Sequence, residues 1–281
     1  MGRDGRVELV LGREGPDASP LQPNGIALLP DGSFLLADLS EARAGVWRLS
    51  RSREVEPFLL EVGGECLPPT NFVRLDSRGR VWITVSTRVS PRSRDYRPDA
   101  RSGFVILVDG AGARIVADGL GYTNECALDA DEEHLYVNET FARRLTRFRI
   151  APDGSLHDGE TVAEFGAGTF PDGMAIDVEG GIWITSIVSN RVIRVDPEGR
   201  QEVVLDDGDG AHVAWVEEAF QKGTLGRVHL DTMPAGRLPS ISSIAFGGPD
   251  LRTIHLGSLL GDGVATFRSP IPGLPPIHWS L

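Results

Sequence analysis

Cysteine is scarce in this chain, because Cys66 and Cys126 are the only two in 281 residues. Two cysteines are too few for a disulfide framework. The sequence also lacks an apolar run approaching the roughly 20 residues that span a bilayer, and no basic and apolar leader opens the chain at residues 1–5. We therefore expect a cytoplasmic protein that does not cross a membrane.

Positive charge is in deficit. The chain has 28 basic and 40 acidic residues, which gives a net charge of −12. A surface with this balance repels polyanions and anionic membranes over most of its area. The expected partner is a small-molecule substrate, with no nucleic acid and no membrane, and the sequence does not indicate an oligomeric state.

Several catalytic signatures are missing. No G-x-S-x-G motif, phosphate loop or dinucleotide fingerprint occurs, and none of the six histidines forms an H-x-x-x-H pair. Neither cysteine has the surroundings of a nucleophile. These absences disfavour covalent catalysis and nucleotide chemistry.

One short pattern recurs four times. Each copy has a polar residue, about five mostly apolar residues, a turn rich in Asp, Glu and Gly, and a β-branched or aromatic strand. The copies are spaced 47, 53 and 48 residues apart, close to the roughly 40 to 50 residues of one four-stranded propeller blade. The recurring polar residues are Asn24, Asn71, Asn124 and Asp172.

The strand pattern predicts an all-β fold, a β-propeller of four-stranded blades in a single domain over residues 1–281. Five units are readable, the fifth over residues 242–269, and its missing outer strand is expected from RVELVLG at residues 6–12, which would close the ring. The stretch AHVAWVEEAFQKG, residues 211–223, has helix-like spacing. It is either an inserted helix or a degenerate sixth blade.

Blades arranged around an axis bring equivalent positions to one channel. The four recurring polar residues should therefore converge there as a ring of oxygen donors, and hard cations take oxygen ligands. The sequence predicts a divalent metal site formed by Asn24, Asn71, Asn124 and Asp172.

Three segments carry a family resemblance: FPDGMAIDVEGGIWITSIVSNRVIRVDPEG, YTNECALDADEEHLYVNETFARRLTRF and SSIAFGGPDLRTIHLGS. They resemble the SMP-30, gluconolactonase and luciferin-regenerating-enzyme group of six-bladed propellers. The resemblance implies six blades and a divalent cation, usually Ca²⁺, held by residues matching Asn71, Asn124 and Asp172, with a glutamate from the first blade. Zn²⁺, Mn²⁺ and Mg²⁺ remain alternatives.

Two positions depart from the family pattern. The first unit offers Asn24 where the family has a glutamate, and Glu14 in GREGPD is the alternative if the N-terminal blade is shortened. Glu125 follows Asn124 where many relatives have a small residue. Strand alternation points Glu125 away from Asn124, so we expect it between blades or in contact with substrate.

A cation with open positions polarises a carbonyl and binds water, which suits hydrolysis of a lactone or related cyclic ester, with Asp172 as catalytic residue and metal ligand. The alternatives are metal-assisted C–C cleavage or hydration at an activated ketone, and a non-catalytic binding or scaffold propeller with a structural ion. The loop over residues 87–103 contains five arginines and is a candidate lid, in which Arg88 is a candidate substrate-binding residue.

Overall fold

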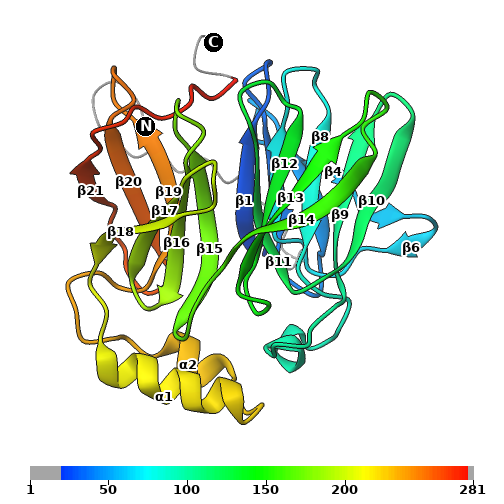
Figure 1. Cartoon of the computed structure of the whole chain (residues 1–281). Helices are drawn as coiled ribbons and strands as arrows, with labels where there is room; N and C mark the ends of the chain where they lie inside the picture. Colours follow the sequence, from blue (N-terminus) through cyan, green and yellow to red (C-terminus); the bar gives the residue numbers. More distant parts are fainter. Residues whose placement is uncertain (1–19, 278–281) are drawn as a thin grey trace.

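Each repeated segment folds into the two innermost strands of an antiparallel sheet, and the apolar runs that follow complete it. The computed structural model describes residues 20–277, and Figure 1 shows the sheets standing as blades around an axis. Blade 1 contains β1 (Pro23–Leu28), β2 (Phe34–Asp38), β3 (Gly45–Leu49) and β4 (Val55–Leu59); blade 2 contains β7 (Phe72–Leu75), β8 (Val81–Val85), β9 (Gly103–Asp109) and β10 (Gly112–Leu120). Blade 3 contains β11 (Thr123–Leu128), β12 (His134–Glu139), β13 (Arg144–Ile150) and β14 (Leu156–Glu164); blade 4 contains β15 (Thr169–Ile176), β16 (Ile182–Val188), β17 (Arg191–Val195) and β18 (Gln201–Asp206).

The fifth blade has three strands among the described residues: β19 (Ile241–Gly247), β20 (Thr253–Ser258) and β21 (Ala265–Arg268). The predicted all-β propeller is thus confirmed with five blades, whereas no sixth blade is seen in residues 20–277. The strand expected at residues 6–12 lies outside the described residues. That residues 1–281 form a single domain stays a prediction.

The irregular stretch before blade 5 is an inserted helix. α1 (Gly210–Gln221) begins where Asp209 Oδ1 accepts hydrogen bonds from the amides of Ala211 and His212, and it ends before Gly223, which has φ of +64°. The short helix α2 (Arg227–Asp231) follows it. The remaining small elements are a hairpin of β5 (Glu61–Val62) and β6 (Glu65–Cys66) and one turn of 3₁₀ helix, η1 (Arg92–Asp95).

The turn between the first two strands of a blade is held by an aspartate. Asp177 Oδ1 accepts from the amide of Gly181 at 2.8 Å, and its Oδ2 accepts from Trp183 Nε1 at 2.8 Å. Asp76 bonds Trp82 Nε1 in the same way at 3.0 Å. Both tryptophans are buried, as side chains that pack between blades should be.

The hydrophobic core lies between successive blades rather than in one central mass. Leu35 and Ile83 belong to the cluster between blades 1 and 2, and Tyr136 and Ile184 to the cluster between blades 3 and 4. This is how sheets that each bury one face against a neighbour fill a ring.

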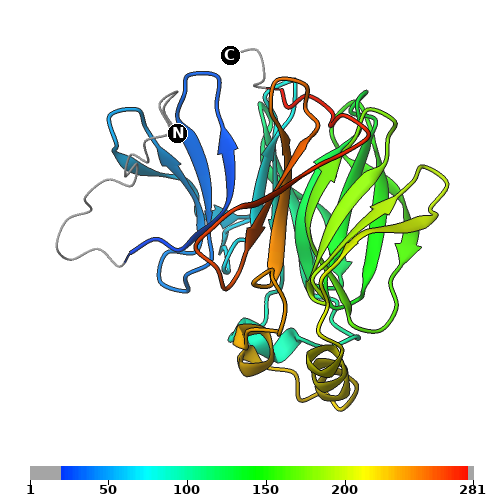
Figure 2. The same cartoon turned by 90° about the vertical axis from the view of Figure 1, so that its left-hand side faces the viewer.

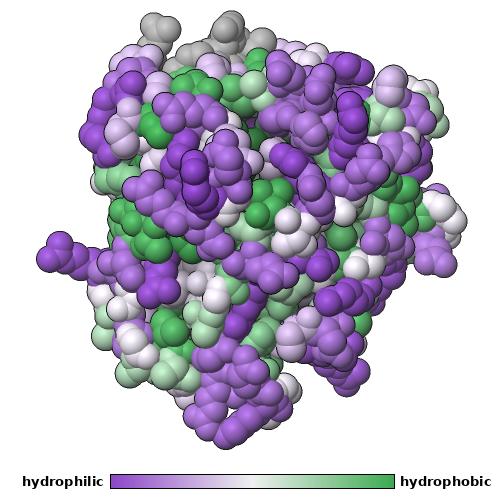
Figure 3. Space-filling model, in the orientation of Figure 1, coloured by the Kyte–Doolittle hydropathy of each residue, from purple (hydrophilic) through white to green (hydrophobic). Residues whose placement is uncertain are grey.

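The two ends of the blades differ. α1, α2 and η1 lie at one end, at the bottom of Figures 1 and 2, whereas the C-terminal segment crosses the other end. There the amide of Leu274 donates to the carbonyl of Ile176 at 2.8 Å. In the view of Figure 3 the surface is mainly hydrophilic with small apolar areas, and no helix within residues 20–277 has the length and apolar character to cross a bilayer.

Candidate functional site

The predicted site residues sit where the inner strands are irregular. Strand pairing slips between Pro23 and Ile26, between Thr123 and Cys126, and between Pro171 and Met174. Asn24, Asn124 and Asp172 each lie inside one of these bulges. β-Bulges redirect side chains and occur often next to active sites, so the chain presents these polar groups at one end of the channel, which we call the site end.

A hydrogen bond from the preceding blade fixes the main chain of three of these residues. Asn24 Nδ2 donates to the carbonyl of Asn71 at 2.9 Å, and Thr84 Oγ1 donates to the carbonyl of Asn124 at 2.5 Å. Asn138 Nδ2 donates to the carbonyl of Asp172 at 2.9 Å. The three residues are therefore held in one register across four successive blades.

The side-chain amides are oriented as well. Asn71 Nδ2 donates to Ser86 Oγ at 3.0 Å, and Asn124 Nδ2 donates to Thr140 Oγ1 at 3.1 Å. Because each amide nitrogen is bound by a hydroxyl of the next strand, the amide oxygen is turned away from that strand. Both asparagines are buried, at 5% and 7% exposure.

The four residues form two pairs. Asn24 Nδ2 donates to Asn71 Oδ1 at 3.2 Å. The Asn124 side chain lies close enough to the Asp172 carboxyl group to lower its pKa. The structure therefore places Asn24 beside Asn71 in blades 1 and 2, and Asn124 beside Asp172 in blades 3 and 4.

Two carboxyl groups of the channel have raised pKa values. Burial raises the pKa of Asp172 to about 7, against the hydrogen bond from Asn124 and the positive charge of Arg92, which lower it. Burial also raises the pKa of Glu125 to about 8, reinforced by the charge of Asp172 and opposed by Arg74. Glu125 Oε2 accepts from the amide of Met174 at 2.9 Å, the kind of bond between blades that strand alternation predicts for it.

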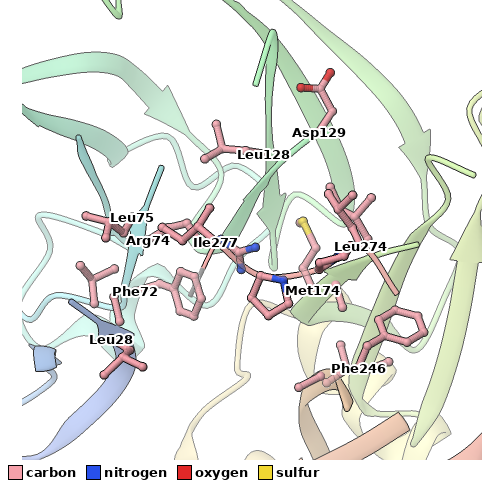
Figure 4. A pocket seen from close by; sticks show the side chains of 18 of the residues that line it. Leu28, Phe72, Arg74, Leu75, Leu128, Asp129, Met174, Phe246, Leu274 and Ile277 are labelled. Carbon is pink, nitrogen blue, oxygen red and sulfur yellow. The ribbon is translucent and has the colours of Figure 1, made fainter. Parts of the chain in front are cut away.

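A cavity of about 500 Å³ lies toward the end of the channel that the C-terminal segment crosses, and none of the four candidate ligands lines it. Figure 4 shows this cavity with the side chain of Arg74 projecting among apolar groups such as Phe72 and Met174, and with Leu274 and Ile277 of the C-terminal segment at its wall. Such a volume is in the usual range for a small-molecule pocket. The innermost strands of all five blades contribute to its lining.

Arg88 is engaged by other groups of blade 2. Its guanidinium donates to both oxygens of Asp118, at 2.7 and 3.0 Å, and stacks over the ring of Phe104 at 4.0 Å. This exposed pair joins the start of the loop over residues 87–103 to β10. The role of Arg88 in substrate binding stays a prediction, and the structure gives it a structural partner instead.

The donor set fits a hard cation. Asn71, Asn124 and Asp172 supply two amide oxygens and one carboxylate, which are the groups that Ca²⁺ and Mg²⁺ prefer. Within residues 20–277 no group of three or more His, Cys, Asp or Glu side chains is placed to hold a metal ion, so a cation here would depend on the two amide oxygens. Glu14, the alternative to Asn24, lies outside the described residues.

Sequence reasoning missed the residues that hold the site rather than form it. Thr84 and Asn138 occupy equivalent places on β8 and β12, two residues after Trp82 and Tyr136. The available signal in the sequence was a polar residue within a strand that is otherwise mostly apolar. Arg92, whose charge acts on Asp172, was one of five similar arginines in its loop.

Blades packed around a channel with fixed amide and carboxylate oxygens at one end define a β-propeller with a polar channel site. The chain belongs to the SMP-30/gluconolactonase/LRE-like family, whose model matches residues 14–208. The resemblance seen in the sequence is thereby confirmed.

Relatives with assigned activities are moderately similar. The 6-deoxy-6-sulfogluconolactonase of Pseudomonas putida is 28% identical over 236 residues, 82% of this chain and 67% of the relative. Pentonolactonase XacC of Haloferax volcanii is 27% identical over 243 residues, 85% of this chain and 68% of the relative.

Solved structures share the fold. A gluconolactonase from Xanthomonas campestris superposes with a TM-score of 0.62 at 18% identity, covering 90% of this chain and 72% of the other. The calcium-binding protein regucalcin from Agrobacterium tumefaciens superposes with a TM-score of 0.59 at 17% identity, covering 91% and 78%.

Proposed function

We propose that this protein is a metal-dependent hydrolase of a sugar-type lactone. The observation that carries the proposal is the set of three oxygen side chains, Asn71, Asn124 and Asp172, each fixed by a hydrogen bond from the preceding blade. The lactonase names of the relatives support the reaction class. The calcium-binding neighbour supports Ca²⁺ as the first cation to test.

The residues divide the chemistry between them. A bound divalent cation would supply positive charge to polarise the lactone carbonyl. Asn71 and Asn124 would hold that cation through their amide oxygens. Asp172 would be both a ligand and the group that orients the attacking water and accepts its proton. Burial raises its pKa to about 7 in the metal-free protein, and a bound cation would lower it again, so that the carboxylate would be charged at neutral pH.

The setting of the reaction follows from the rest of the chain. Cys66 and Cys126 are both unpaired, which supports a reducing, cytoplasmic compartment. The net charge of −12 supports a small-molecule substrate over a nucleic acid or membrane partner. Glu125, which bonds the amide of Met174 in the next blade and feels the charge of Asp172, is a candidate contact for the substrate.

The test combines metal content with turnover. The purified protein is analysed by mass spectrometry for bound metals, and hydrolysis of a lactone panel is measured before chelation, after chelation and after re-addition of Ca²⁺, Mg²⁺, Mn²⁺ or Zn²⁺. About one ion per chain with turnover that chelation abolishes is the expected result. A bound ion with no lactone turnover would favour ketone chemistry or a scaffold role, and a protein that binds no ion would overturn the site.

A further inference from the structure

The arginine-rich loop over residues 87–103 is anchored rigidly at the site end. The buried carboxylate of Asp95 accepts from Thr87 Oγ1 at 2.6 Å and from Ser102 Oγ at 2.8 Å, and Arg97 Nε donates to it at 3.2 Å. These bonds join the two ends of the loop to its middle. The main chain of the loop therefore follows a defined path.

An aromatic cluster holds η1 over the candidate ligands. The ring centroid of Tyr96, which follows η1 directly, lies 5.5 Å from that of Tyr122 and 4.6 Å from that of Phe141, and Phe141 lies 5.9 Å from Phe170. Tyr122 stands two residues before Asn124, and Phe170 two residues before Asp172. Residues of η1 are thus placed beside the channel mouth.

The α1 helix closes the same cluster from the other side. The ring of Phe220 lies edge-to-face against that of Phe170 at 5.2 Å, and the guanidinium carbon of Arg143 lies 4.2 Å from the centroid of Phe220 and 4.4 Å from that of Phe170. Arg143 also donates to Glu217 of α1. The mouth is therefore bordered by η1 and α1, two elements that no propeller blade requires.

Only one arginine of the loop is both half-buried and without a partner among residues 20–277. Arg88 and Arg97 pair with aspartates, and Arg101 donates to main-chain carbonyls. Arg94 is exposed. Arg92, the first residue of η1, is half-buried and has no side-chain hydrogen bond or ion pair.

The position of Arg92 beside the mouth follows from the placement of η1. Arg92 is the first residue of this single turn, and the ring of Tyr96, which follows the turn directly, contacts the rings of Tyr122 and Phe141. The charge of Arg92 acts to lower the pKa values of Asp172 and Tyr122, which agrees with this position, and Arg92 forms no ion pair with Asp172.

We propose that Arg92 binds an anionic substituent of the substrate, so that the preferred substrate is a lactone bearing a terminal carboxylate, sulfonate or phosphate group. This inference rests on the proposed lactone hydrolysis. A guanidinium binds such oxyanions through two parallel hydrogen bonds, and a half-buried one without a protein partner has that capacity unused. Arg92 is here a specificity-determining residue, and it takes no part in proton transfer.

The experiment compares matched substrates. Galactonolactone and galactarolactone differ only in whether the terminal carbon is an alcohol or a carboxylate, and gluconolactone and phosphogluconolactone provide the same comparison for a phosphate. We expect the wild-type protein to have the higher kcat/KM on the charged member of at least one pair, and that pair identifies the anion. In Arg92→Gln this preference should fall roughly 10- to 100-fold, mainly through KM, with turnover of the uncharged member changed less than about threefold.

Arg94→Gln is the control, because it removes the same charge from the same turn at an exposed position. It should leave both substrates unaffected. Equal losses on charged and uncharged lactones in Arg92→Gln would overturn the proposal and assign Arg92 to the reaction itself or to the fold. Equal losses of kcat/KM on the charged lactone in Arg92→Gln and Arg94→Gln would also overturn the proposal, because the effect would then arise from the overall charge of the protein.

A binding measurement separates this inference from the proposed function. The open-chain products galactonate and galactarate, together with gluconate and phosphogluconate, are titrated by calorimetry, which needs no turnover. Tighter binding of a terminally charged acid that is lost in Arg92→Gln upholds the anion site even if no lactone is hydrolysed. Lactone hydrolysis without any preference for charge, in turnover or in binding, would overturn the anion site and leave the proposed function intact.

Discussion

The side chain of Asn24 donates to Asn71 twice, to the main-chain carbonyl at 2.9 Å and to Oδ1 at 3.2 Å. Thr84 and Asn138 donate to the next blade's main chain in the same way. Asn24 is exposed, whereas Asn71 is buried. Asn24 and Asn71 occupy equivalent places in the sequence repeat. In the structure, however, Asn24 is a hydrogen-bond donor that positions Asn71.

The first prediction therefore separates Asn24 from Asn71. Asn71→Ala removes a candidate ligand oxygen and should lower metal affinity more than about 100-fold. Asn24→Ala removes only a positioning bond and should lower it about tenfold, as loss of an outer partner commonly does. Calorimetric titration of the metal-free protein with Ca²⁺ measures both. If the two variants lose affinity equally, Asn24 is a ligand, as the sequence predicts.

A second prediction concerns pH and the metal-free protein. The pKa of Asp172 is raised from 3.8 to about 7 and that of Glu125 from 4.5 to about 8. Between about pH 4 and pH 8 the folded state therefore binds more protons than the unfolded state, so the free energy of unfolding falls as pH rises. In chelator, Tm should be several degrees lower at about pH 8 than at about pH 5.

Asp172→Asn provides the control for this pH dependence. The amide cannot ionise, so the part of the decline between about pH 4 and pH 7 should become smaller. Saturating Ca²⁺ should also reduce it in the wild type, because the cation stabilises the charged carboxylate. The same slope in the wild type and in Asp172→Asn would assign the decline to other groups, such as the excess of acidic residues.

The strands were predictable because their signal is local. Alternating apolar residues and turn-forming Asp and Gly recur in each unit, and of the two alternatives for residues 211–223 the inserted helix is found, at Gly210–Gln221. The bond from Thr84 to Asn124 joins residues 40 apart, and it exists only once blades 2 and 3 stand side by side. No local pattern indicates it.

The loop over residues 87–103 shows a second reason why the site could not be predicted fully from the sequence. Its arginines are alike in sequence, and Arg88 was the candidate for substrate binding. The buried Asp95 and Tyr96 determine the path of the loop. That path pairs Arg88 with Asp118 and leaves Arg92 at the channel mouth. Which arginine faces the site thus depends on tertiary contacts rather than on composition.

A third prediction tests the protonation state of Glu125. With a pKa of about 8, its carboxyl group is mostly neutral at pH 7, and glutamine has nearly the same shape. Glu125→Gln should keep the acceptor for the Met174 amide and retain activity within about threefold at pH 7. Any loss of wild-type activity above about pH 8 that arises from Glu125 should disappear in this variant.

Glu125→Ala is the comparison, because it removes the acceptor as well as the charge. It should be less stable by about 1–3 kcal/mol, the typical cost of leaving a buried donor without a partner. Unfolding in urea measures this difference in stability, and pH–rate profiles measure the activity of Glu125→Gln. A folded Glu125→Gln protein without activity at pH 7 would show instead that the reaction requires the carboxylate.

The fourth prediction concerns the bond between a turn aspartate and a tryptophan that blades 2 and 4 share. Trp183 is 1% exposed, and its Nε1 donates to Asp177 Oδ2, which also accepts from Arg194 Nε at 2.7 Å. Trp183→Phe removes this bond and leaves a small cavity, while Arg194 still compensates the buried charge. The free energy of unfolding should fall by about 2–4 kcal/mol.

Trp215→Phe is the matched control, since Trp215 is 40% exposed and its replacement should change stability by less than about 0.5 kcal/mol. Urea unfolding of both variants decides the matter, and similar losses in the two would mean that the bond to Asp177 does not stabilise blade 4.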